Sequence, residues 1–178
     1  MSYENPGDLD GNNGGGASGN GAATPQAAGP ETQGARLQVV GQYVKDLSFE
    51  NPGAGMSDIK SRPQIDLGVD LQAGRVEGDR FEVELKLRVS AKADERAIFL
   101  LELIYCGVFM VENVPEEVLQ QVLLVEGPHL LFPFARRVVA DVIRDGGMPP
   151  LMIEPIDFNA LYQAKAAEGA AQRAGAQR

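Results

Sequence analysis

Few residues in this chain of 178 could do chemistry, since it contains one histidine, His129, and one cysteine, Cys106. No Ser or Cys nucleophile motif surrounds His129, so the paired nucleophile and base that covalent catalysis needs are not evident. No spacing of Cys and His resembles a zinc site. The adjacent carboxylates Glu116 and Glu117 fit the start of a helix, whose dipole favours negative charge. We therefore predict no catalytic site, no metal and no cofactor, so the chain is not expected to be an enzyme.

The charge of the chain disfavours two classes of partner. With 16 Lys and Arg against 25 Asp and Glu, the net charge is −9. Residues 1–35 contain four acids and no base, residues 164–178 contain three bases and one acid, and residues 36–163 are left with −7. An acidic domain suits neither duplex nucleic acid nor an anionic membrane surface. The longest apolar stretch, residues 103–111, is too short to span a bilayer, and no secretory signal is apparent, so we expect a soluble protein.

The composition divides the chain into two tails and one folded domain. Residues 1–35 contain nine glycines and almost no large apolar side chain, so they cannot bury enough surface to offset the entropy of ordering. Residues 164–178 are rich in Ala, Gly, Gln and Arg and lack an apolar stripe. We predict a disordered tail over 1–35, a folded domain over 36–163 and a second flexible tail over 164–178.

The first part of the domain has the alternation typical of strands. Apolar and polar residues alternate over 37–50, 64–72 and 80–92, with turn residues between these segments. In the first segment the predicted apolar face consists of Leu37, Val39, Tyr43, Leu47 and Phe49. Residues 97–111 are apolar on both faces, with Glu102 as the interruption of one of them. Short turns between consecutive strands favour an antiparallel sheet.

The second part of the domain has helical spacing. Asn113 fits an N-cap, and a short helix over 116–126 is predicted to end at Gly127-Pro128. A longer helix over 129–145 carries a wide apolar stripe that includes Phe134. An extended piece follows at 151–153, and Asp157 caps a last helix. The predicted fold class is α+β, with a four-stranded antiparallel sheet followed by a long helix and a short C-terminal helix.

This domain has more apolar surface than one small core can use. The second face of the strand over 97–111, the segment 151–153 and the last helix all remain to be covered. Loops and the last helix could cover them within one chain. The alternative is subunit association together with an apolar groove, for which aromatic and Met side chains are suited because they re-pack readily.

Several motifs in order make the chain similar to a known family. The segment Leu131–Arg136, which reads LFPFAR, resembles the SecB family of bacterial protein-export chaperones. Four further segments resemble the same family: residues 43–52 (YVKDLSFENP), 99–102 (FLLE), 107–109 (GVF) and 155–162 (PIDFNALY). The resemblance implies a cytoplasmic homotetramer, a dimer of dimers with eight-stranded sheets, and no enzymatic activity. Such a protein keeps precursor proteins unfolded without ATP and passes them to the SecA ATPase of the translocase.

The resemblance also implies which residues would bind SecA. The SecA-docking site of the family corresponds here to Asp46, Glu50, Leu100 and Glu102. The alternation agrees with this assignment, because Asp46 and Glu50 share one face of the first strand, and Leu100 and Glu102 share one face of the fourth. If the two strands are neighbours, the four side chains form one acidic patch with an apolar centre. The implied partner is the basic zinc-binding tail of SecA.

Two further sets of residues follow from the same resemblance. Positions that tune tetramer assembly correspond to Leu101, Leu103 and Tyr105, on the opposite face of the fourth strand. The groove for unfolded clients corresponds to Tyr43, Phe49, Leu151, Ile153, Phe158, Leu161 and Tyr162. The chain departs from the family before Pro63, where a Trp is common and this sequence has Lys60-Ser61-Arg62.

Two other functions remain open from the sequence. A SecB-like chaperone dedicated to a toxin–antitoxin pair would share the fold but not the general export role. An enzyme or small-ligand domain on an α+β scaffold is the second alternative, and the lack of a polar constellation argues against it.

Overall fold

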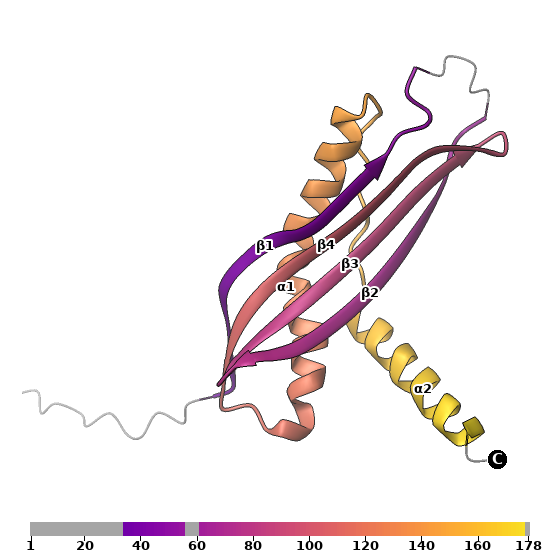
Figure 1. The fold of residues 1–178 in the computed structure, drawn as a ribbon. Helices are drawn as coiled ribbons and strands as arrows, with labels where there is room; N and C mark the ends of the chain where they lie inside the picture. The colour runs from indigo at the N-terminus through magenta and orange to yellow at the C-terminus, as the bar shows by residue number, and fades with distance from the viewer. Residues whose placement is uncertain (1–33, 56–60, 177–178) are drawn as a thin grey trace, which may run out of the picture. The chain divides into compact units, whose positions relative to one another are not determined.

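The computed structural model describes residues 34–55 and 61–176, and these form a sheet followed by two helices (Figure 1). The strands are β1 (Arg36–Glu50), β2 (Gln64–Glu77), β3 (Arg80–Ala93) and β4 (Arg96–Glu112). The helices are α1 (Glu116–Asp145) and α2 (Phe158–Ala176). The predicted α+β class and the four predicted strands are confirmed. The predicted tail over 1–35 and Lys60 lie outside the described residues, except for Gly34 and Ala35.

The four strands form one antiparallel sheet in the order β1-β4-β3-β2. The two hairpins have two-residue turns whose backbone has positive φ, as the right-handed twist of the strands requires. Gly78 (φ 52°) begins one turn, and Asp94 (φ 50°) with Glu95 (φ 61°) forms the other. The tight turn at Gly78 allows β2 to continue to Glu77, beyond the predicted end at residue 72. Because of the strand order, β1 and β2 are the two edge strands of the sheet.

Helix α1 covers one side of this sheet, which we call the core face. In Figure 1 the helix crosses behind the strands at an angle to them. The core face is formed by the odd-numbered residues of β3 and of most of β4, which are buried: Phe81, Val83, Leu85, Leu87, Val89, Leu101, Leu103, Tyr105, Phe109 and Val111. Buried residues of α1 face them: Leu123, Leu131, Ala135, Val139 and Ile143. The opposite side of the sheet is called the outer face below, and neither of the two described helices covers it.

Helix α1 is continuous, so the two separate helices predicted over 116–126 and 129–145 are wrong. Gly127 and Pro128 lie inside the helix and are buried against the sheet. A side chain at Gly127 would come within 3.1 Å of a methyl group of Val83 on β3, so glycine permits the close approach of helix and strand. The helix penalty of about 1 kcal/mol for Gly and 3 kcal/mol for Pro is offset by this burial.

The two helix starts differ from each other in how they are capped. The predicted N-cap at Asn113 is wrong, because Asn113 adopts a left-handed conformation (φ 56°) and Pro115 occupies the cap position of α1 without a side-chain hydrogen bond. At α2 the prediction is confirmed, since Asp157 Oδ1 accepts a 2.9 Å hydrogen bond from the backbone N–H of Ala160. The backbone of α2 continues to Ala176, into the segment assigned to a flexible tail, whose flexibility stays a prediction.

Strand β1 contains two β-bulges, and because of them its side chains do not share the single apolar face that was predicted. The register shifts between Val39 and Gly41 and again between Val44 and Asp46. Each shift of one residue turns the following side chains to the other face. Tyr43 therefore pairs with Cys106 on the outer face, whereas Phe49 pairs with Leu101 on the core face.

Candidate functional site: the outer face of the sheet

The predicted docking residues lie together on the outer face, where β1 pairs with β4. The register places Asp46 opposite Ile104, Ser48 opposite Glu102 and Glu50 opposite Leu100. Directly paired residues point to the same side of a sheet, and diagonal neighbours are about 7–8 Å apart. The four residues Asp46, Glu50, Leu100 and Glu102 thus form one acidic patch around an apolar centre, called the docking patch below. The predicted grouping is confirmed, and its role stays a prediction.

A polar network lies beside the docking patch, further along the outer face. The second bulge of β1 leaves Lys45 out of the ladder, and its Nζ reaches Glu82 Oε2 at 2.7 Å and Glu84 Oε1 at 2.5 Å on β3. Tyr43 donates a hydrogen bond of 2.7 Å to Glu82 Oε1. The hydrogen bonds from Lys45 and, to a lesser extent, from Tyr43 lower the pKa of Glu82. The bond to Glu82 in turn raises the pKa of Tyr43.

The thiol of Cys106 is buried beneath this network. Burial, followed by the negative charges of Glu82 and Glu84, raises its pKa to about 11. Ligand atoms of Cys106, Glu82 and Glu84 lie within 4.8 Å of one another, as in some metal sites. Lys45 bridges both carboxylates, and the thiol is held protonated, whereas a metal needs the thiolate. The group is therefore a salt-bridge network with a thiol beneath it, and we assign no metal to it.

The residues predicted to line the client groove are not all on one surface. Phe49 is half-buried on the core face, with its ring 6.1 Å from that of Phe99. Ile153 and Phe158 are buried in the core, and Phe158 packs edge-on against Phe132 of α1. Tyr43, on the outer face, is separated from them by the sheet. The sequence did not reveal this separation, because the alternation of residue types does not show where a one-residue bulge turns the following side chains to the other face.

One half-buried member of that set, Tyr162, borders a hollow beside α2. Leu151, Leu161 and Tyr162 are partly exposed. Tyr162 lines a hollow of about 390 Å³ together with Leu71, Leu124 and Lys165, which come from β2, α1 and α2. Lys165 also forms an ion pair with Asp70 of β2. Part of the predicted groove is therefore a surface where three elements meet.

The predicted assembly residues belong to the core of a single chain. Leu101, Leu103 and Tyr105 lie on the core face and are at most 7% exposed. Phe134, which the sequence assigns to the apolar stripe of the helix, is instead 42% exposed. With Leu130, which is also exposed, it forms an apolar surface on α1 that the pattern did not separate from the buried stripe.

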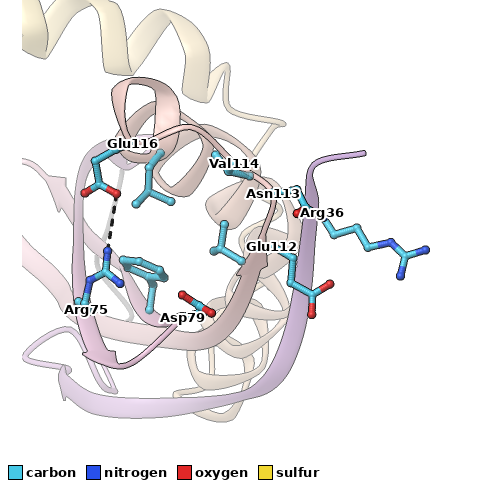
Figure 2. Close-up of a pocket in the computed structure, with 10 residues that line it drawn as sticks. Arg36, Arg75, Asp79, Glu112, Asn113, Val114 and Glu116 are labelled. Atoms are coloured by element: carbon cyan, nitrogen blue, oxygen red, sulfur yellow. Dashed lines mark ion pairs between the residues drawn. The ribbon is translucent and has the colours of Figure 1, made fainter. Parts of the chain in front are cut away.

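A second pocket, of about 480 Å³, lies at the end of the sheet where α1 begins (Figure 2). Arg75 stacks on the ring of Phe81 at 4.5 Å, and its Nη2 lies 3.7 Å from Glu116 Oε2. Figure 2 shows Arg36 pointing away from this pair. The lining includes three acids and two arginines, which makes it poorly suited to an anion, and we assign no function to it.

The structure thus combines an antiparallel sheet backed by a long helix with an acidic patch on the other face of the sheet. The family described as "Preprotein translocase subunit SecB" matches residues 30–169. The protein-export protein SecB of Paramagnetospirillum magneticum is 52% identical over 141 residues, which cover 78% of this chain and 90% of the relative. That of Maricaulis maris is 48% identical over 147 residues, covering 82% and 86%. This chain belongs to the SecB family, and it is accordingly a chaperone of protein export.

A solved structure shares the fold at low sequence identity. The SecB-like chaperone Rv1957 of Mycobacterium tuberculosis, in complex with a ChAD peptide from the HigA1 antitoxin, superimposes with a TM-score of 0.59 and 16% identity. The match covers 68% of this chain and 91% of the other. At this identity the likeness concerns the fold alone. The export proteins are about 50% identical, so the toxin–antitoxin function is not favoured.

Proposed function

We propose that this chaperone holds unfolded precursors in the cytoplasm without ATP and delivers them to SecA through the docking patch. The observation that supports it best is the meeting of Asp46, Glu50, Leu100 and Glu102 on the face that α1 and α2 leave uncovered in the described part of the chain. Carboxylates around the partly exposed Leu100 suit a partner segment that carries basic residues. Such complementarity steers association and weakens as salt screens the charges.

Client binding would use the apolar surface beside α2. Leu151, Leu161 and Tyr162 are partly exposed, and the hollow next to Tyr162 offers room for an apolar side chain. Ile153 and Phe158 are buried, so a client would contact them after a displacement of the C-terminal segment. Holding an unfolded protein follows from mass action, because binding lowers its free concentration, and many weak contacts add by avidity.

A homotetramer, a dimer of dimers, would cover two surfaces that one chain leaves open. The edge strand β1 has exposed apolar side chains, including Val40 and Val44, and its outer edge is available for pairing with a second copy. The exposed apolar surface of α1 at Leu130 and Phe134 would meet another subunit. Leu101, Leu103 and Tyr105 would influence assembly indirectly, by setting the position of α1. Light scattering should give about four times the chain mass of 19.0 kDa.

The docking patch is tested by the combined substitution of Asp46→Ala and Glu102→Ala. We expect SecA affinity, measured by calorimetry at low salt, to fall about tenfold or more, because two carboxylates facing the basic partner are lost. Suppression of the aggregation of an unfolded precursor without nucleotide should be unchanged.

The control carries Glu117→Ala and Glu126→Ala, two exposed acids of α1, which changes the net charge equally. Unchanged SecA affinity in the first variant would contradict the docking site. Failure of the unsubstituted protein to suppress aggregation would contradict the holding function.

A further inference from the structure

We propose that Arg88 competes with the basic partner for Glu102 and thereby sets the affinity of the docking patch. This inference rests on the proposed function, because it assumes that the patch binds a partner. Arg88 lies on β3 directly opposite Glu102 of β4. Its Nη1 lies 2.5 Å from Glu102 Oε1, which makes a charge-assisted hydrogen bond within the chain.

Glu102 is set apart from the other two acids of the patch by this pairing. Among the described residues, Asp46 and Glu50 have no ion pair, whereas Glu102 is already bound to a guanidinium. The nearby Lys45 and Lys86 are directed to Glu84 instead, at 2.5 and 3.4 Å. A basic partner would therefore meet two available carboxylates and one that is occupied.

The pair is exposed enough to be exchanged. The side chains of Arg88 and Glu102 retain 65% and 44% of their accessible surface. Exposed ion pairs stabilise a protein only weakly, which corresponds to a factor of about two to five in an equilibrium. A partner cation can replace Arg88 at Glu102, and the replacement lowers the observed affinity by a similar factor. The positive charge of Arg88 adds repulsion toward the same partner.

The strand on the other side of Arg88 provides space for the displaced side chain. The residue opposite Arg88 on β2 is Gly68, and both residues line a hollow of about 420 Å³ that extends to Glu102 and Asp46 of the docking patch. A Cβ at Gly68 would lie 3.7 Å from the Cβ of Arg88, so the gap directly borders the arginine. Asp66 and Asp70 flank Gly68 on the same face, at positions diagonal to Arg88. Asp70 is paired with Lys165, so Asp66 is the carboxylate available to the displaced guanidinium. The guanidinium can turn from Glu102 toward β2 without becoming buried.

The test is the substitution Arg88→Gln, with SecA binding measured by calorimetry at low salt. We expect affinity to rise about threefold to tenfold, because the competing cation and its repulsion are both removed. The matched control is Arg80→Gln, which changes the net charge equally on the same strand and the same face. It lies eight residues away, about 26 Å along the strand, and should alter affinity less than about twofold.

A double-substitution cycle separates competition from simple charge. In a Glu102→Gln background the competition is absent, so the gain from Arg88→Gln should shrink to the part that repulsion alone supplies. Thermal melts of each variant establish that the sheet is intact. Unchanged or reduced affinity of Arg88→Gln, or a gain equal to that of Arg80→Gln, overturns the role of Arg88.

The proposed function fails in a different way. If the substitutions Asp46→Ala and Glu102→Ala leave SecA affinity unchanged, the docking patch itself is wrong, and the role of Arg88 is wrong with it. If they weaken binding and Arg88→Gln has no effect, only the competition is excluded.

Discussion

The two faces of the sheet are made by the same strands and have opposite properties. On β4, Leu101 and Leu103 are 0% and 1% exposed beneath α1, whereas their neighbours Leu100 and Glu102 on the outer face are partly exposed. The period of two places every second side chain on each side, so one strand contributes to folding with one set of residues and to recognition with the other. Substitutions on the core face should therefore change stability, and those on the outer face should change binding.

The largest expected effect comes from Leu103→Ala on the core face. Removal of a buried leucine side chain and formation of a cavity should lower the free energy of unfolding by about 2–5 kcal/mol. Ile104→Ala is the matched control, because Ile104 is the next residue and is only half-buried on the outer face. Urea denaturation at one fixed protein concentration measures both. Equal losses for the two variants would contradict the division of the strand into two faces.

The next largest effect concerns Cys106, which lies on the outer face but is buried. A thiol with a pKa of about 11 is mostly protonated at pH 8, and its thiolate fraction is about two orders of magnitude below that of an ordinary cysteine. Alkylation by iodoacetamide, followed by mass spectrometry, should be slower than in the unfolded chain by at least that factor.

The rate should also rise about tenfold for each pH unit between pH 8 and 10, because the thiolate fraction does so below the pKa. A rate that becomes constant above pH 9 would show that burial and the charges of Glu82 and Glu84 do not keep the thiol protonated. The outer face would then be open at this position.

The smallest of these effects is expected at Gly107 of β4, against which Leu131 of α1 packs. A Cβ at this position would lie 2.6 Å from Leu131 Cδ2 and 2.8 Å from Phe109 Cε2. Gly107→Ala should therefore destabilise the protein by about 1–3 kcal/mol through overpacking. Gly41→Ala on β1 is the control, since no atom lies within 4 Å of its added Cβ. A stable Gly107→Ala variant in thermal melts would mean that the helix can move away from the sheet.

The strands could be predicted from the local alternation of residue types. The residues of the docking patch were implied by the resemblance to the SecB family, and the alternation agreed with them. Asp46 and Glu102 needed only the pairing of β1 with β4 to lie on one face. The helix boundary could not be predicted, because Gly127-Pro128 stops an isolated helix and is retained here by contact with Val83. The position of Tyr43 was missed for another reason, since the bulges depend on how β1 fits β4.

The exposure of Phe134 has the same origin. Helical spacing identifies an apolar residue but not the side on which the sheet lies, so Phe134 and Leu131 look alike in the sequence. In the structure Leu131 is buried against Gly107, and Phe134 is exposed. The distinction comes from the placement of α1 on the sheet, which local patterns do not encode.

The bulge at Val44 and Asp46 has a consequence for how β1 can change in evolution. The extra residue sets which side chains after it face outward, so the loss of one residue at this point would turn Asp46 and Glu50 into the core and Phe49 toward solvent. Single substitutions along this strand alter one contact, whereas a single deletion exchanges its two faces. The strand can therefore vary in composition between Tyr43 and Phe49, but its length there is constrained.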